Sequence, residues 1–393
     1  MNKSIIFTAH ILACVVISIF ASGAHSQLPV KSAGETGFNY EINLAANYAA
    51  RLMETEKIPG AAFFIINEGS VIYKSALGYS NIKKSVKFDF NKTAFAAGSL
   101  SKIFTSLAVL KMSQAGCFDL KDPFIKHVAH TSVNAEVNIE SLLTHSSGFE
   151  NCSKLYIEDG SEPQTLKKFT KLHMPGFTAK NIGEKFAYSN YNYALLGVLI
   201  EEISKIDFYE YIKNNIFEPL NMVHSSFNIK DKIEKKNFTS GEIEICAGYD
   251  INRSGYVECK IKNHNMPPAS ALITTAGDIA VLASQFFEKE DKMDKKNYII
   301  DNKLLKEIFK NRIAVKNAAI LDAYPPIDIM TCMFRHSIIS KTDVYFHTGS
   351  IRGFSCGLYI IPEKKFAFFI ACNSSNTQFR QKLTHFVFDQ FLK

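Results

Sequence analysis

The segment Ser99-Leu100-Ser101-Lys102 has the residue types and the spacing of an activated serine nucleophile. It opens an apolar run, Lys102–Ala115, which predicts a helix that is buried on most sides. Residues three apart share one face of a helix, so the Lys102 amine can reach the Ser99 hydroxyl. A serine hydroxyl is a weak nucleophile until a base takes its proton, and a desolvated lysine can be that base.

A second segment with the same spacing, Ser80-Asn81-Ile82-Lys83, competes with the first. It lies in a polar stretch between predicted strands, and no buried helix follows it. We therefore assign the nucleophile to Ser99.

The segment Tyr188-Ser189-Asn190 supplies a second set of polar groups, just before a predicted helix at Tyr191–Ile203. A tyrosine phenol can shuttle protons if cations lower its pKa, and an asparagine amide can hold a substrate carbonyl. The pattern alone fits a helix N-cap beside a packed tyrosine equally well, and Tyr79-Ser80-Asn81 has it too.

A third element, His347-Thr348-Gly349-Ser350, ends a predicted strand at Val344–Thr348. A small residue on an edge strand lets a substrate lie against the backbone. The N–H of Ser350 could then complete an oxyanion hole with that of Ser99. The alternative is a strand end followed by a tight glycine turn.

The elements that must position these residues form an α+β pattern. Strands are predicted near both ends of the chain, and helices lie between them, which indicates an antiparallel sheet with an inserted, mainly helical region. The further predicted strands are Ala61–Asn67, Ser70–Lys74, Ser355–Ile361 and Phe366–Cys372, and the further predicted helices are Thr275–Phe287 and Thr377–Leu392.

The composition of the 393 residues is that of an ordinary globular protein, with 47% hydrophobic and 21% charged residues. The formal net charge is +7, but the basic residues are scattered and no nucleic-acid-binding module is present, so we expect no nucleic-acid partner. The sequence has no CxxC and no HExxH motif, and we expect no metal or other cofactor.

Residues 1–26 have the pattern of a secretory signal peptide: Lys3, an apolar stretch at Ile5–Phe20 and small residues at Ala21–Ser26. A retained N-terminal anchor is the alternative. Cleavage would leave residues 27–393 as one domain. We expect this domain to be exported to the bacterial periplasm or secreted. No second apolar segment of the sequence is long enough to span a bilayer.

Export would leave seven cysteines, an odd number, so at least one thiol is expected to be free. Cys246 and Cys259 flank a hairpin-like turn. If that hairpin pairs symmetrically about Asn252 and Arg253, the two cysteines face each other, and we hypothesise a disulfide between them.

The order of these three motifs resembles the serine β-lactamase and penicillin-binding-protein superfamily, in particular its class C-like branch, which includes DD-peptidases and esterases. The resemblance extends over nearly all of the chain after residue 26. Further matching segments are Pro59-Gly60-Ala61-Ala62, Asp122-Pro123, Leu142–Phe149, Pro268-Ala269-Ser270-Ala271 and Thr274–Asp278. We interpret His145, within the third of these, as structural.

The resemblance implies a role for each site residue. Ser99 is the acylated nucleophile, Lys102 its proton acceptor, and Tyr188 the acid/base that serves the leaving group. Asn190 is similar to the family's contact with the substrate amide.

The resemblance also implies that the substrate lies along His347, Thr348, Gly349 and Ser350. Many family β-lactamases have lysine where this chain has His347, which argues against efficient β-lactam hydrolysis. If His347 helps to recognise a substrate carboxylate, affinity should rise as the pH falls through its pKa, which is about 6.5 for free histidine. The alternative is an esterase in which His347 only shapes the strand.

The activity that follows is a serine hydrolase working through an acyl-enzyme, on a D-amino-acid peptide or a β-lactam-like amide. Its partner would be a small molecule or peptide, including peptidoglycan fragments. An esterase of the same fold and a non-catalytic peptidoglycan- or penicillin-binding protein are the alternatives. The α/β-hydrolase architecture is disfavoured because no GxSxG elbow occurs. The sequence does not indicate an oligomeric state.

Overall fold

The computed structural model describes residues 39–129, 132–158, 161–228, 243–288, 298–315 and 324–392. The predicted signal peptide at residues 1–26 lies outside this part of the chain. None of the helices in the described ranges is long and apolar enough to cross a membrane.

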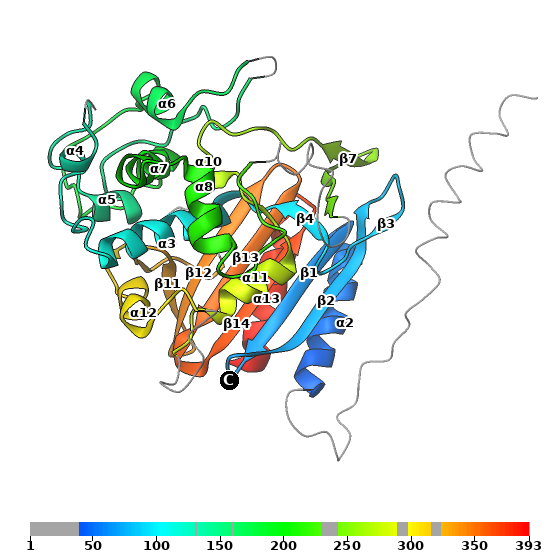
Figure 1. The fold of residues 1–393 in the computed structure, drawn as a ribbon. Coiled ribbons are helices and arrows are strands. Elements are labelled where there is room, and N and C mark those ends of the chain that lie inside the picture. Colours follow the sequence, from blue (N-terminus) through cyan, green and yellow to red (C-terminus); the bar gives the residue numbers. More distant parts are fainter. Residues whose placement is uncertain are drawn as a thin grey trace, which may run out of the picture.

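A nine-stranded antiparallel sheet forms the centre of the molecule, in the order β3-β2-β1-β14-β13-β12-β11-β10-β9 (Figure 1). The first strand of the chain, β1, pairs with the last, β14, so strands from the two ends of the described chain are neighbours inside the sheet. The strands are β1 (Gly60–Asn67), β2 (Ser70–Asn81), β3 (Val86–Lys87), β9 (Ile313–Ala314), β10 (Ile329–Met330), β11 (Arg335–Ile339), β12 (Thr342–Ile351), β13 (Phe354–Ile361) and β14 (Phe366–Cys372).

Both faces of the sheet are covered, because successive side chains of a strand point to opposite sides. Phe63 of β1 packs toward α2 (Asn39–Thr55) and α13 (Thr377–Phe391). Phe64, the next residue, packs into the larger core with α11 (Ala276–Ser284) and the helical region. Strands buried on both faces are apolar almost throughout, as β1 and β14 are.

The inserted helical region lies on the side of the sheet where β12 and β11 are found (Figure 1). Its centre is α3, which is buried along nearly its whole length, as the apolar run predicts. The region contains the short 3₁₀ turn η1 (Gly98–Leu100) and the helices α3 (Ser101–Gln114), α4 (Phe124–His127), α5 (Ile139–Leu143), α6 (Leu166–Leu172), α7 (Asn190–Ser204), α8 (Phe208–Ile212), η2 (Lys213–Phe217), α10 (Pro267–Ser270) and α12 (Asn302–Ile308).

Shorter strands connect the region to the sheet. β4 (Thr93–Ala96) leads into η1 and lies between β5 (Glu244–Ile245) and β8 (Ile273–Thr274). A separate hairpin consists of β6 (Gly248–Asn252) and β7 (Gly255–Cys259), and a 3₁₀ turn, η4 (Pro362–Lys364), joins β13 to β14. The architecture confirms the α+β class and the inserted helical region.

Several boundaries differ from those that the sequence predicts. β12 is longer than predicted at both ends, so Gly349 and Ser350 lie inside the strand and not after its end. β2 continues to Asn81, so Ser80 lies inside a strand and not between strands. Its buried hydroxyl contacts Glu244, whereas Lys83 extends to the surface and pairs with Glu258, so the second serine–lysine segment does not come together. α11 ends at Ser284 because the next two N–H groups bond three residues back, in a tighter turn.

The predicted disulfide is wrong, because Cys246 and Cys259 are both free. The hairpin pairs Asn252 with Gly255, and Cys259 therefore lies opposite Gly248. The N–H of Cys246 instead bonds the carbonyl of Ala94 in β4. Cys246 precedes the hairpin, which begins at Gly248, and the hairpin does not pair in the predicted register, so the two cysteines do not face each other.

Phe369 in β14 tests how far stability depends on the core between sheet and helices. Its ring stacks on Phe64 at 5.3 Å and on Phe95 at 6.1 Å between centroids. Phe369→Ala should lower the free energy of unfolding by about 3–5 kcal/mol, measured by urea denaturation. Ile338→Ala is the control on β11, where the side chain is 62% exposed, and should change it by less than about 0.5 kcal/mol. Similar losses in both variants would contradict this assignment of the core.

Candidate active site

The predicted nucleophile, Ser99, lies in η1 where β4 turns into α3. The turn depends on Gly98, whose φ is +53°, a conformation that favours glycine. A Cβ at Gly98 would lie 2.9 Å from the side chain of Ile351 and 3.2 Å from the backbone N of Ser350. The serine turn therefore lies directly against the end of β12.

Gly349 is the counterpart of Gly98 on β12. A Cβ at Gly349 would lie 1.9 Å from the carbonyl oxygen of Ala97, a distance that no side chain can adopt. The glycine is thus required by the close approach of two backbones, which also brings the backbone of Ser350 beside the turn that carries Ser99. The structure brings these predicted residues together.

Lys102 is fully buried in the first turn of α3. Its Nζ donates to the carbonyl oxygen of Ala269 at 2.7 Å and to Oδ1 of Asn190 at 2.8 Å, and it lies 3.4 Å from Oγ of Ser99. Burial lowers the pKa of the Lys102 amine from its ordinary value. A neutral amine, able to accept a proton, is thereby more accessible here than on an exposed lysine.

Tyr188 precedes α7 and places its Oη 2.9 Å from Oγ of Ser99. Nζ of Lys102 lies 5.0 Å from the centre of its ring, and the guanidinium carbon of Arg335 lies 5.8 Å from it. Burial by itself would raise the pKa of Tyr188, but the two cations outweigh it, and the pKa falls below its ordinary value. The phenol thus has the electrostatic surroundings of a proton shuttle.

Asn190 is the first residue of α7 and does not act as its N-cap, which is Ser189. Its Oδ1 accepts from Lys102, and its Nδ2 donates to Oδ1 of Asn151 at 3.2 Å. Asn151 also accepts the backbone N–H of Asn190 at 2.9 Å, a contact that no sequence pattern indicates. Asn190 therefore holds Lys102 in place, and one hydrogen of its amide is left for another acceptor.

His347 lies within β12, two residues before Gly349. The side chain is buried, and its Nδ1 donates to the carbonyl oxygen of Thr348 at 2.9 Å. Burial, together with the nearby charges of Arg335 and Lys102, holds the pKa of His347 well below its ordinary value. Burial therefore disfavours the charged imidazole, and recognition of a carboxylate by a charged His347 stays a prediction.

Arg335 supplies the permanent charge instead, and the sequence analysis missed it. It lies on β11, next to β12, and its Nη1 donates to Oγ1 of Thr348 at 2.8 Å. The only signal in the sequence is a charged residue directly after the apolar Met333 and Phe334. A buried arginine needs a partner, but that partner is visible only once β11 and β12 are paired.

The described segments contain no group of three or more His, Cys, Asp and Glu side chains that could hold a metal ion. The polar groups that meet in this cluster are the hydroxyl of Ser99, the phenol of Tyr188 and the amine of Lys102.

Two bacterial proteins are similar to this chain in sequence. Protein flp of Staphylococcus aureus strain COL is 28% identical over 334 residues, which are 83% of this chain and 61% of that protein. The putative penicillin-binding protein PbpX of Bacillus subtilis is 28% identical over 169 residues, which are 42% of this chain and 40% of that protein. The chain thus spans about three fifths of the length of flp.

Solved structures share the fold. The octameric penicillin-binding protein homologue from Pyrococcus abyssi has a TM-score of 0.69 at 25% identity, over 84% of this chain and 73% of that chain. The D-amino acid amidase from Ochrobactrum anthropi SV3 has a TM-score of 0.70 at 18% identity, over 88% of this chain and 98% of that chain. The family model described as Beta-lactamase matches residues 45–391. This chain, with its serine, lysine and tyrosine gathered between the sheet and the helical region, belongs to the beta-lactamase family.

Proposed function

We propose that this protein is a serine hydrolase that forms an acyl-enzyme on Ser99, with D-amino-acid peptides that end in a free carboxylate as substrates. The observation that carries the proposal is the contact of Ser99 Oγ with Tyr188 Oη at 2.9 Å beside the buried amine of Lys102. A hydroxyl in this arrangement has both a base and a proton donor within reach.

In the proposed acylation, Ser99 Oγ attacks the substrate carbonyl carbon, and its proton passes to the neutral amine of Lys102. Tyr188 gives its proton to the leaving amine as the carbon–nitrogen bond breaks, and Lys102 returns a proton to Tyr188. Deacylation reverses these transfers: water loses a proton to the Tyr188–Lys102 pair, and Ser99 Oγ regains one. The balance leaves the three side chains as they began.

The negative charge that develops on the carbonyl oxygen needs donors in fixed positions. The backbone N–H groups of Ser99 and Ser350 are the proposed pair. The close approach of Gly98 to Ser350 supports this role, because it brings the end of β12 beside the serine turn. These donors belong to the backbone, so side-chain motion cannot remove them.

Arg335 and Thr348 support the choice of substrate. The guanidinium bonds the Thr348 hydroxyl, on the strand along which the substrate is proposed to lie, and it stays charged at all physiological pH. A free carboxylate is its natural partner. The names of two similar proteins point the same way, since one is a D-amino acid amidase and the other a putative penicillin-binding protein. Both names refer to amide compounds, which favours an amide of a D-amino acid over a simple ester as the substrate.

Loss of the Ser99 hydroxyl should abolish covalent labelling by a penicillin or a fluorophosphonate, observed by intact-protein mass spectrometry. Ser99→Ala should still fold, since the hydroxyl contributes little packing. Ser113→Ala, at the other end of α3, is the matched control and should label like the parent protein. Ser80→Ala is unsuitable as a control because that hydroxyl is buried against Glu244. Absence of any label on the folded parent protein would favour the non-catalytic binder.

Tyr188→Phe removes only the oxygen that faces Ser99, and turnover should fall about 10²- to 10⁴-fold with little change in melting temperature. Tyr191→Phe, in the first turn of α7, should give the opposite result. Its hydroxyl donates to the carbonyl of Thr170, so its loss should cost about 1 kcal/mol of stability and leave turnover unchanged. Wild-type turnover in Tyr188→Phe would make Tyr188 a packing residue only.

The pH dependence separates Arg335 from His347 as the group that recognises the carboxylate. Acylation of every substrate should rise with pH as Lys102, the proton acceptor, loses its proton at a pKa below that of an ordinary lysine, and should fall at higher pH as Tyr188, the proton donor, loses its own. The ratio of kcat/KM for a peptide acid to that for its C-terminal amide should stay flat between about pH 5 and pH 8, because Arg335 stays charged and His347 stays neutral.

Arg335→Gln should lower that ratio about 10- to 100-fold, and Arg335→Lys should restore part of it. The melting temperatures of both variants separate loss of recognition from loss of folding. A ratio that increases as the pH falls through about 6.5 would identify His347 as the cation. Equal turnover of acid, amide and simple ester would support the esterase.

A further inference from the structure

His145 contacts three consecutive residues around the proposed acid/base. Its carbonyl oxygen accepts the N–H of Ala187 at 2.7 Å, and its Nδ1 accepts the N–H of Ser189 at 3.2 Å. Between these two bonds its ring lies against the ring of Tyr188, with 4.5 Å between centroids and 35° between planes. His145 therefore bonds the backbone of the residues before and after Tyr188 and also packs against the Tyr188 ring.

The backbone of His145 is strained. Its φ is +55°, in the left-handed region that residues other than glycine rarely adopt, and the residue is buried. Such a conformation is energetically unfavourable for a residue other than glycine and persists only where the surrounding contacts determine it. Residues with strained backbones are often found at active sites, where the surrounding structure holds a side chain in one orientation.

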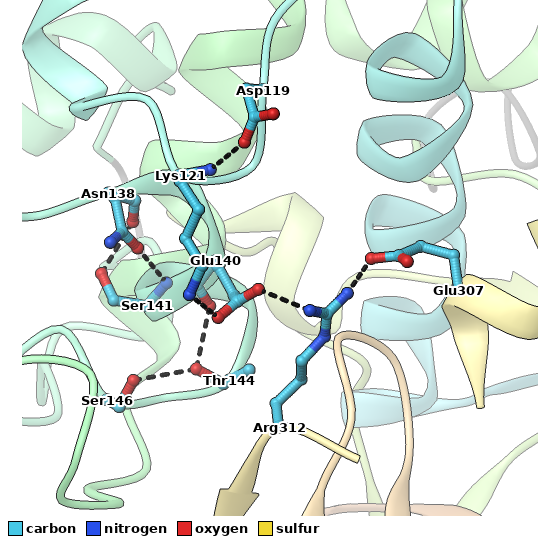
Figure 2. A network of polar contacts seen from close by, with 9 residues as sticks. All are labelled: Asp119, Lys121, Asn138, Glu140, Ser141, Thr144, Ser146, Glu307 and Arg312. Carbon is cyan, nitrogen blue, oxygen red and sulfur yellow. Dashed lines mark hydrogen bonds and ion pairs between the residues drawn. The ribbon is translucent and has the colours of Figure 1, made fainter. Parts of the chain in front are cut away.

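The residues on either side of His145 are fixed by hydrogen bonds, which Figure 2 shows. The hydroxyl of Thr144 donates to the carbonyl oxygen of Glu140 at 2.8 Å and lies 2.8 Å from the hydroxyl of Ser146. The N–H of Ser146 bonds the carbonyl oxygen of Ser141 at 2.8 Å. The turn that carries His145 is thus bonded back onto α5.

α5 in turn is held by buried charges. The Glu140 carboxylate accepts from Nη1 of Arg312 at 2.9 Å and from Lys121, and Arg312 also pairs with Glu307 of α12 (Figure 2). Arg312 directly precedes β9, at the edge of the sheet. Breaking a buried pair leaves a charge without a partner, so this network resists displacement of α5.

The imidazole of His145 is neutral. Nδ1 can accept the Ser189 N–H only while it carries no proton. Burial, and then the charges of Lys102 and Arg335, hold the pKa of His145 well below its ordinary value. Burial also holds the pKa of His347, a second histidine near this site, well below its ordinary value. His145 is therefore suited to hold Tyr188 in place and not to exchange protons near neutral pH.

We propose that His145 is a positioning residue that holds the Tyr188 hydroxyl at hydrogen-bond distance from Ser99. The inference rests on the proposed function, in which Tyr188 transfers protons. It goes beyond that function by assigning the orientation of Tyr188 to a residue that contacts neither Ser99 nor Lys102 through a hydrogen bond.

Two variants separate the contacts that His145 makes. His145→Asn keeps an acceptor near the position of Nδ1 and tolerates the left-handed backbone, but it loses the ring. His145→Phe keeps a ring and loses the acceptor. In each, the rate constant for acylation of Ser99 by a penicillin should fall about 10- to 100-fold, as for a reacting group displaced by about 1 Å, while the dissociation constant of the complex before acylation stays within about twofold.

The double variant tests whether the effect acts through Tyr188. With Tyr188→Phe already present, His145→Asn should reduce acylation by no more than about a further twofold, because the hydroxyl it positions is gone. A merely structural role predicts the same loss in both backgrounds. His173→Asn is the matched control, since His173 packs at 4.8 Å on Phe169 away from the site and should leave acylation unchanged.

Hydrogen exchange gives a readout that needs no activity. The Ser189 amide should exchange slowly in the parent protein and in His145→Asn, and faster in His145→Phe, where its acceptor is lost. The proposed function fails if folded parent protein is never labelled at Ser99. The positioning role fails if labelling of the parent is matched by both single variants, if the losses are additive with Tyr188→Phe, or if Ser189 exchange is equal in all three proteins.

Discussion

Burial of the Lys102 amine is the constraint that the rest of the site satisfies. A buried ammonium loses its hydration, so acceptors must come to it from the protein. The carbonyl of Ala269 comes from α10 and the amide oxygen of Asn190 from α7, elements far apart in the chain. The packing of α3, α7 and α10 around one amine is therefore also what brings Tyr188 to Ser99.

The sheet provides the second wall of the site. Gly349 lets β12 approach Ala97 more closely than any side chain would allow, and Gly98 turns the chain toward that strand. The neighbouring strand β11 adds Arg335, so that Tyr188 lies between two buried cations. Their combined field lowers the cost of negative charge on the phenol and on a substrate oxygen nearby.

The network around Glu140 shows how distant segments bear on this geometry. Arg312 is far from Ser99 in the sequence, yet it anchors α5 and with it the turn that carries His145. The site is thus held from two directions, by hydrogen bonds to the Lys102 amine and by a strained turn against Tyr188. The first support comes from α7 and α10 within the helical region, and the second is anchored by Arg312, next to β9 at the edge of the sheet.

The sequence alone determined the parts that depend on local spacing. Ser99 and Lys102 are one helical turn apart, α3 is apolar on all sides, and the strands of the last third alternate or run apolar in a recognisable way, so the fold class and the core of the site could be predicted. Tyr188 and Asn190 entered through the order of motifs and the resemblance to a family, since their pattern alone is common.

Tertiary structure decided everything that depends on register and burial. Arg335 reaches Thr348 only because β11 and β12 pair in one register, and the pKa of His347 is lowered because burial in the assembled site removes water from it. Cys246 and Cys259 are kept apart by the register of their hairpin, which sequence symmetry could not supply. Local periodicity follows from neighbouring residues, whereas partners and pKa values follow from contacts between segments that the sequence keeps far apart.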